Sequence, residues 1–156
     1  MKVRIAHPDE IDAITALINL AFQVEKFFVD GDRIGAVEVR SLFQKGWFLM
    51  IEEDNALCGC VYVEPRGSRA YLGLLSIHPQ RQGMRLGARL VAAAEEEARR
   101  RSLDAMDLNI VNVREELPGF YRKLGYSETG TSPFPAEIPT KIPCHFIRMS
   151  KTLGLD

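Results

Sequence analysis

A mixed α/β fold is predicted for this chain by the alternation of short apolar runs with amphipathic helices. Strand-like runs are found at 2–6, 47–52, 57–64, 70–77, 105–111, 125–130 and 144–150. The first is followed by one or two helices, the next three form a meander, and a long helix and then a short helix separate the last three. A meander is antiparallel, whereas a helical crossover joins parallel strands. We therefore expect an α/β (α+β mixed) sheet, largely antiparallel in its N-terminal half.

Two helices carry strong periodic patterns. Over 8–21 the apolar residues recur at helical spacing, with Pro8 at a first helical position. The second helix is predicted over 84–101. There Glu95, Glu96 and Glu97 each precede an arginine by four residues, a spacing that favours ion pairs along one face. That run predicts a solvated helix face.

Turn signals separate the strands. Asp54-Asn55 reads as a tight hairpin turn, and Gly67-Ser68 divides the next two strands. Residues 131–143 contain four prolines, which exclude helix and central strand alike. This segment is predicted to be a long irregular loop, a kind of loop that in compact domains is usually functional or disordered.

Composition favours a single domain spanning 1–156. The net charge is -1, which gives no global field toward nucleic acid or anionic lipid, and no apolar run is long enough for a membrane helix. The chain starts in strand-like sequence and shows no signal peptide. An odd number of cysteines argues against a disulfide framework and predicts a cytoplasmic protein. Cys58 and Cys60 would share one face of an alternating strand, which favours core packing.

The most informative segment is 77–90, where an apolar strand runs through Pro79 into a polar turn and then a helix. Gly83 and Gly87 lie four residues apart around the helix start. Unpaired amides and a partial positive charge at a helix N-terminus bind anions, and glycines let an anion approach the backbone. The third glycine and the acid of a dinucleotide fingerprint are missing, as is the Gly-Lys-Ser/Thr of a nucleoside triphosphate loop. The pattern predicts a pyrophosphate site.

Two motifs in the chain carry a family resemblance. The first is the run Ile77-x-Pro79-x-x-Gln82-Gly83-x-x-Leu86-Gly87-x-x-Leu90, which is similar to the acetyl-CoA signature of the GNAT superfamily of N-acetyltransferases. The second is Phe120-Tyr121-Arg122-Lys123-Leu124-Gly125-Tyr126, similar to the Tyr-x-x-x-Gly-Phe/Tyr segment of the second cofactor wall. The element order also agrees along nearly the whole chain.

The resemblance implies a GNAT-like acyl-CoA N-acyltransferase fold with a splayed parallel pair, strands 70–77 and 105–111, at the cofactor site. The cofactor would be acetyl-CoA, whose pantetheine arm pairs with the exposed edge of the first strand. Its implied contacts are Leu75, Ile77, Gln82, Gly83, Met84, Arg85, Leu86, Gly87, Ala88, Asn112 and Tyr121. Gly73, in mid-strand, marks either a bulge or a simple packing gap.

Two positions depart from the family pattern. Arg85 stands where the signature has its first glycine, and we expect its backbone to be helical, since a helical φ needs no glycine. Arg114 stands where the family often has Asn, seven residues before Tyr121. Asn112 lies two residues earlier and is our candidate for that polar contact.

The implied reaction is direct transfer of acetyl to a primary amine. It needs a base for the amine and an acid for the departing thiolate. Tyr121 matches the family position of the general acid, although a Tyr beside Phe120 also suits a core. Glu64 ends the third strand near the expected acceptor cleft and is our candidate base.

Acceptor contacts are less specified. Glu25 lies among aromatic residues, which suit a cationic amine but also suit helix packing with a surface acid. His145, on the last strand, is a further candidate, although a lone strand histidine is more often structural. Arg33 could bind an acceptor carboxylate or be solvated.

The remaining expectations concern partners. The scattered His and Cys residues predict no metal site. We expect a small-molecule amine acceptor, no nucleic acid and no membrane partner. The terminal strand 144–150 could pair across a homodimer. The competing interpretation is a non-catalytic acyl-CoA-binding or regulatory module of the same fold.

Overall fold

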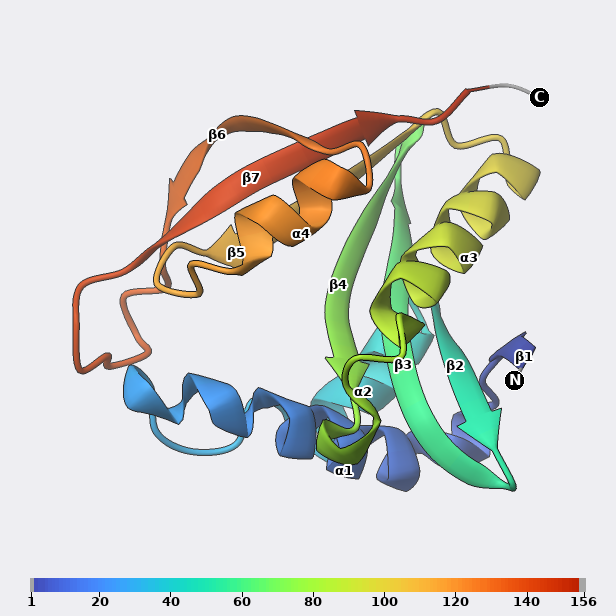
Figure 1. Cartoon of the computed structure of the whole chain (residues 1–156), viewed down its shortest axis with the longest axis horizontal. Helices are drawn as coiled ribbons and strands as arrows, with labels where there is room; N and C mark the ends of the chain where they lie inside the picture. Colours follow the sequence, from blue (N-terminus) through green and yellow to red (C-terminus); the bar gives the residue numbers. More distant parts are fainter. Residues whose placement is uncertain (1, 155–156) are drawn as a thin grey trace.

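The computed structural model describes residues 2–154 and contains one mixed sheet in the order β1-β2-β3-β4-β5-β7-β6 (Figure 1). Its strands are β1 (Lys2–Ile5), β2 (Trp47–Glu53), β3 (Ala56–Arg66), β4 (Arg69–Ile77), β5 (Ala105–Val111), β6 (Ser127–Pro133) and β7 (His145–Thr152). The α-helices are α1 (Ile11–Ala21), α2 (Ala36–Phe43), α3 (Leu86–Arg100) and α4 (Leu117–Lys123). Short 3₁₀ segments are η1 (Pro8–Glu10), η2 (Phe22–Phe27) and η3 (Pro79–Arg81). The predicted fold class and element order are confirmed.

Both sheet faces are covered in part by helices, which makes two apolar cores. α3 and α4 pack on one face, where Leu90 and Tyr121 are buried against β2–β5. α1 and α2 cover the other face and bury Ile14 and Val39 against β2 and β3. Burial of these apolar faces is the main force that holds the layers together. The helices on the second face contact β2, β3 and β4 but leave the β5–β7–β6 part of that face open.

The sheet splits between β4 and β5. These strands are parallel but pair only at Ala70–Met106 and Tyr71–Asp107, after which they diverge. Figure 1 shows β2–β4 and β5–β7 meeting at one end and separating toward the other. The predicted splayed parallel pair is confirmed, and it leaves a gap between the two halves of the sheet.

A β-bulge lies in β4 beside this gap. Cys60 faces Ser76 and Tyr62 faces Gly73, so β4 has one extra residue at this point. Leu74 takes the extra position with φ 55, in the left-handed region that a branched side chain rarely adopts. Gly73 therefore marks a bulge, one of the two readings of the sequence.

A second bulge corrects the reading of the cysteines. Ile51 faces Gly59 whereas Glu52 faces Leu57, so Cys58 is an extra residue in β3. The bulge breaks the alternation of side chains, and Cys58 packs with the α3 core while Cys60 packs with the α1–α2 core. Both thiols are buried and free, but they do not share a face.

The C-terminal strands also differ from expectation. β6 extends through Pro133, so residues 131–133 are strand and not loop; β6 is an edge strand, where proline is tolerated. β7 lies between β5 and β6, and both of its edges are paired. Pairing of β7 across a homodimer is therefore excluded.

The acidic run on α3 is only partly solvated. Glu96 is exposed, whereas Glu95 and Glu97 are buried. Glu95 accepts hydrogen bonds from the Tyr126 hydroxyl (2.8 Å) and from Lys151 Nζ (2.9 Å). The predicted Glu95–Arg99 ion pair is also present, at 3.9 Å. The predicted Glu97–Arg101 pair is present, at 2.9 Å.

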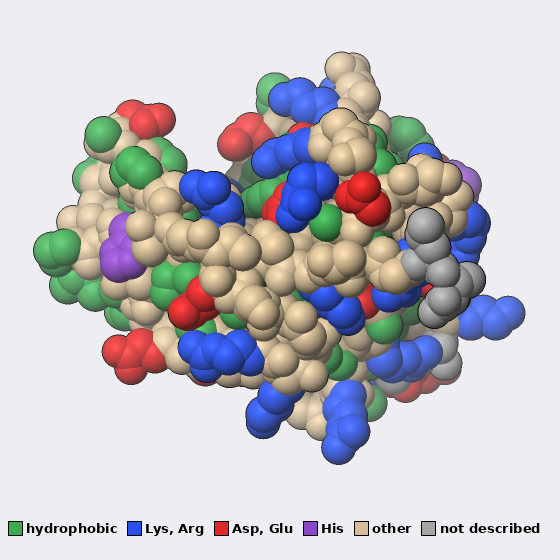
Figure 2. Space-filling model, turned by 90° about the horizontal axis from the view of Figure 1, so that it is seen from above, with side chains coloured by type: hydrophobic (Ala, Val, Ile, Leu, Met, Phe, Trp, Pro, Cys, Tyr) green, Lys and Arg blue, Asp and Glu red, His purple; other side chains and the backbone are tan. Residues whose placement is uncertain are grey.

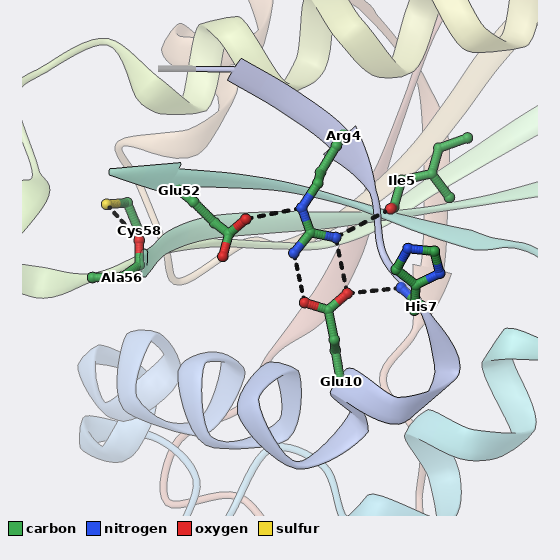
Figure 3. Close-up of polar contacts among 7 residues, drawn as sticks. All are labelled: Arg4, Ile5, His7, Glu10, Glu52, Ala56 and Cys58. Atoms are coloured by element: carbon green, nitrogen blue, oxygen red, sulfur yellow. Dashed lines mark hydrogen bonds and ion pairs between the residues drawn. The ribbon is translucent and has the colours of Figure 1, made fainter. Parts of the chain in front are cut away.

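An ion cluster fixes the first strand to the sheet and to the first helix. The Arg4 guanidinium donates to Glu10 (2.6 and 2.9 Å) and to Glu52 (2.8 Å), and the His7 amide donates to the same Glu10 carboxylate (Figure 3). The Arg4 hydrogen bond, together with the His7 amide, lowers the pKa of Glu10 to about 2, although partial burial opposes this. The cluster ties β1, η1 and β2 together.

This cluster predicts a defined pH dependence of stability. The folded pKa of Glu10 lies below its ordinary value, so the stabilisation is complete above about pH 5 and is lost as the pH falls toward 2. Because both partners are partly exposed, Glu10→Gln is expected to lower the free energy of unfolding by about 1 kcal/mol at neutral pH. Chemical denaturation should show this difference shrinking below about pH 4. Asp9→Asn, an exposed neighbour, is the control; a loss equal to that of Glu10→Gln would contradict the assignment.

Candidate active site

The gap between β4 and β5 leaves one edge of β4 without a strand partner. Beyond Tyr71, the β4 backbone pairs only with β3, so residues 72–77 have an unpaired edge within the described chain. Leu75 and Ile77, the predicted pantetheine contacts, lie in this stretch after the bulge. Gln82 folds back on the strand end, with its Nε2 3.4 Å from the Ile77 carbonyl oxygen. The unpaired edge has the form that an extended ligand joins by main-chain hydrogen bonds.

The N-terminus of α3 lies directly after this strand. The helix begins at Leu86, two residues later than predicted, and its first-turn amides have no partner inside the helix. Gly83 has φ 85 and open space where a Cβ would be. A Cβ on Gly87 would lie 3.3 Å from the Phe120 ring and 3.8 Å from Leu75, which places Gly87 between β4 and α4. These features suit an anion held by backbone amides next to the strand edge.

The expectation for Arg85 was wrong. Its φ is 58 and its ψ is 24, so it has left-handed backbone geometry at the N-cap of α3. A left-handed residue with a side chain is strained, because its Cβ approaches the following carbonyl oxygen. The family glycine at this position therefore has a conformational reason, and Arg85 lacks that freedom.

Arg85→Gly is expected to raise the free energy of unfolding by about 1 kcal/mol, because glycine adopts this conformation without strain. Thermal or chemical unfolding measures the change. Glu96→Gly, on the exposed face of the regular part of α3, is the matched control and is expected to lose about 1 kcal/mol. Equal losses in both variants would contradict strain at Arg85.

Tyr121 projects from α4 into the core behind the gap. Its ring meets Phe120 at 4.9 Å and Tyr126 at 5.8 Å between centroids, and the residue is 5% exposed. Within residues 2–154 its hydroxyl makes no hydrogen bond. Burial raises the pKa of Tyr121 well above its usual value, so the phenol keeps its proton at neutral pH. A protonated, unengaged hydroxyl is fitted to donate a proton to a ligand in the gap.

Glu25 is buried, so the interpretation of this residue as a surface acid is wrong. From η2 it reaches Arg114 in the loop between β5 and α4, with 3.0 Å between Oε2 and Nη1. Arg114 also pairs with Glu116 at 2.8 Å. Burial raises the pKa of Glu25 and the Arg114 guanidinium opposes that rise. The pair connects segments on opposite sides of the split sheet.

Glu64 faces Tyr71 across the β3–β4 pair. It accepts hydrogen bonds from the Tyr62 hydroxyl (2.8 Å) and from Arg66 Nε (2.7 Å). Burial alone would raise the pKa of Glu64, but these two hydrogen bonds outweigh it and lower the pKa below its usual value. The carboxylate is ionised at neutral pH and lies beside Tyr71 and Arg66.

Asn112 and His145 are brought together, but through the backbone of His145. The backbone N–H of His145 donates to the side-chain Oδ1 of Asn112 at 2.8 Å, and the backbone N–H of Asn112 donates to the His145 carbonyl oxygen at 2.9 Å. The His145 side chain is exposed. Asn112 thus ends the β5–β7 pairing, a structural role that occupies its side-chain oxygen.

A cleft of about 540 Å³ opens on the sheet face that α1 and α2 leave uncovered. Tyr71 and Asp107, the last paired residues before the gap, contribute to its wall together with Asn109. Its basic lining residues are Arg66, Arg69 and Arg148. Sequence reasoning missed Tyr71 and these arginines. The alternation of strand residues could have placed them on one face, but only the cross-strand register shows that they meet.

The comparisons with known proteins match this geometry. Residues 13–126 match the Acetyltransferase (GNAT) family. The chain belongs to this family. A curated relative, 5-NmdU N-acetyltransferase of Pseudomonas phage PaMx11, is 27% identical over 92 residues, which are 58% of this chain. The match spans 64% of the length of that relative.

Solved structures of the family share the fold. One is yncA from Salmonella typhimurium, solved with its cofactor acetyl-CoA, with TM-score 0.79, 20% identity and coverage of 99% of this chain and 94% of that one. Another is an aminoglycoside 6'-N-acetyltransferase complexed with coenzyme A, with TM-score 0.77, 21% identity and coverage of 99% and 98%. At these identities the likeness establishes the fold of this GNAT protein, and its chemistry is argued below from its own residues.

Within residues 2–154, no helix is long and apolar enough to cross a membrane. In the same range, no three His, Cys, Asp or Glu side chains are grouped so that they could hold a metal ion. On the face seen in Figure 2, Lys and Arg side chains lie among Asp and Glu side chains, and hydrophobic side chains gather at one end.

Proposed function

We propose that this GNAT protein is an N-acetyltransferase that moves acetyl from acetyl-CoA directly to the primary amine of a small acceptor. The observation that carries the proposal is the unpaired edge of β4 leading straight into the N-terminus of α3, with the Tyr121 hydroxyl unengaged behind the same gap. The family match over 13–126 supports it.

The residues present fit acetyl-CoA. The backbone of Leu75 and Ile77 would hold the pantetheine arm along the open strand edge. The turn and first helical turn of α3 would hold the pyrophosphate through backbone amides, from Gln82, Gly83, Met84, Arg85, Leu86, Gly87 and Ala88. Asn112 remains a weaker candidate, because its oxygen is already occupied by the His145 amide. When bound, acetyl-CoA supplies an activated acetyl thioester.

Two side chains carry the proton transfers in this proposal. Tyr121 holds its proton because burial raises its pKa, and it would donate that proton to the leaving thiolate. Glu64 is ionised and lies opposite Tyr71, a residue of the cleft wall, so it would receive the ammonium form of the acceptor and accept its proton directly or through water. Glu25 is the second candidate base; burial raises the pKa of its carboxyl, and the Arg114 guanidinium opposes that rise.

Calorimetric titration with acetyl-CoA and with CoA tests the proposal first, followed by a thiol-release assay against a panel of amines. The panel includes 5-NmdU, the compound named for the phage relative. We expect binding of both cofactor forms and turnover with at least one amine. Gly87→Val should weaken CoA binding, since a branched side chain would fill the space between Leu75 and Phe120. Gly119→Ala, where an added Cβ meets nothing within 4 Å, should not.

The absence of any acetyl-CoA or CoA binding at millimolar concentration would sink the proposal. Binding without turnover across the panel would favour the alternative, a non-catalytic acyl-CoA-binding module. We also infer a cytoplasmic location from the free thiols of the described chain, which cell fractionation tests. A homodimer, if one forms through the sheet, would use the edges of β1 or β6, because β7 is internal.

A further inference from the structure

The cleft beside the gap carries more positive charge than its own carboxylate neutralises. Its arginines are Arg66, Arg69 and Arg148, and its acidic lining residue is Asp107. Arg69 is already satisfied, because its Nε and Nη2 both donate to Asp107, at 2.7 and 2.6 Å. Asp107 also accepts from the Ser150 hydroxyl. This closed group leaves Arg148 as the cation of the cleft lining without an ion-pair partner among the described residues, while Arg66 pairs with Glu64 at its edge.

Arg66 is held in place with most of its donors unused. Its Nε donates to Glu64, and its guanidinium lies over the Tyr71 ring at 4.0 Å from the centroid. In the described chain its Nη1 and Nη2 atoms have no hydrogen-bond partner. A guanidinium fixed by one hydrogen bond and by stacking is preorganised to receive an anionic oxygen.

Arg148 is the second available cation. It lies on β7 opposite Asn109, and its side chain forms no hydrogen bond or ion pair with residues 2–154. The Arg69 hydrogen bonds lower the pKa of the Asp107 carboxyl, and the charge of Arg148 adds to that lowering. Arg33 adds positive potential from the loop before α2, since it also acts electrostatically on Tyr71. Its described contact is with the Phe22 ring, at 5.4 Å.

We propose that the acceptor is a small amine that also carries an anionic group, bound by Arg66 and Arg148 while Glu64 faces its amine. This inference rests on the proposed acetyl transfer, whose acceptor it specifies. Glu64 and Arg66 are two residues apart on β3 and present a carboxylate and a guanidinium side by side. That arrangement complements a zwitterion such as an α-amino acid, in which ammonium and carboxylate are neighbours.

Binding of matched amine pairs to the CoA-loaded protein tests the inference. CoA lacks the acetyl group, so the complex does not turn over during calorimetry. Two pairs differ by a carboxylate: phenylalanine with phenethylamine, and histidine with histamine. A third pair, phosphoethanolamine with ethanolamine, differs by a phosphate. The anionic member of a pair is expected to bind at least about tenfold tighter, the effect of one to two charge-assisted hydrogen bonds. The arms distinguish a carboxylate from a phosphate.

Variants assign the preference to the cleft. Arg148→Gln removes a side chain without described hydrogen-bond or ion-pair partners. This variant and Arg66→Gln should each reduce, several-fold, the ratio of the affinities of the anionic and the neutral-tailed amine in any pair that shows a preference. Arg40→Gln, an exposed arginine on α2, should keep the ratio. Equal or tighter binding of the neutral-tailed amines would overturn the inference, and so would a preference that survives both cleft variants.

The outcome is separable from that of the proposed function. Failure of CoA to bind rejects the acetyl transfer, and the same pairs are then titrated onto the CoA-free protein. Binding of CoA with no binding of any anionic amine leaves the acetyltransferase assignment standing and rejects the anionic acceptor.

Discussion

Tyr121→Phe is expected to lower kcat by about 10² or more while the stability of the protein changes little. Loss of a general acid typically costs 10² to 10⁴ in rate. The ring contacts with Phe120 and Tyr126 remain in the variant, and within the described residues the lost hydroxyl makes no hydrogen bond. Steady-state kinetics with the best amine, together with denaturant unfolding, measures both quantities.

Tyr126→Phe is the matched control for this experiment. Its hydroxyl donates to the buried Glu95 at 2.8 Å, so its removal should cost about 1–2 kcal/mol of stability with a much smaller change in kcat. If Tyr121→Phe keeps the parental kcat, Tyr121 is a packing residue and the general acid lies elsewhere.

Arg114→Met is expected to destabilise the protein by about 3 kcal/mol, because it leaves the buried Glu25 carboxylate without its partner. The sign of the pH dependence follows from the raised folded pKa of Glu25. The penalty for ionising the Glu25 carboxyl in the folded state grows as the pH rises above the pKa that this group has in the unfolded chain. The loss of stability in Arg114→Met should therefore be larger near pH 8 than near pH 4. Denaturant unfolding at several pH values measures it.

Two further variants make this result specific. Glu116→Gln removes the exposed partner of Arg114 and should cost less than about 1 kcal/mol. The double variant Arg114→Met with Glu25→Leu removes both buried charges and should recover part of the loss. An Arg114→Met variant no less stable than Glu116→Gln would show that the pair contributes nothing to stability.

The fold was accessible from the sequence because its signals are local. Helical spacing, turn residues and the order of strands and helices are each read within a short window, and the two motifs around Gly83 and Tyr121 then specified the family. The splayed pair followed from that resemblance, whereas the anion site at the start of α3 was predicted from the glycines and the helix N-terminus and stays a prediction.

Most of the errors involve contacts that no short sequence pattern displays. Cys58 changes face because of a bulge set by pairing with β2, and Glu95 is buried because Lys151 and Tyr126 reach it. Glu25 is buried with Arg114 as its partner, and Arg114 lies 89 residues away along the chain. Arg85 was misread for a different reason, since a backbone angle at a helix start depends on the preceding turn and not on the residue type alone.

The internal position of β7 has a consequence for folding during synthesis. β5 has only two paired positions with β4, and the described partner of β6 is β7. Strands β5 and β6 therefore leave the ribosome before the strand that joins them, and the second half of the sheet cannot close until β7 emerges. The meander β2–β4 needs no such delay, since each strand pairs with the one just made. We expect nascent chains that lack β7 to protect the meander from proteolysis while the region from β5 onward is cut.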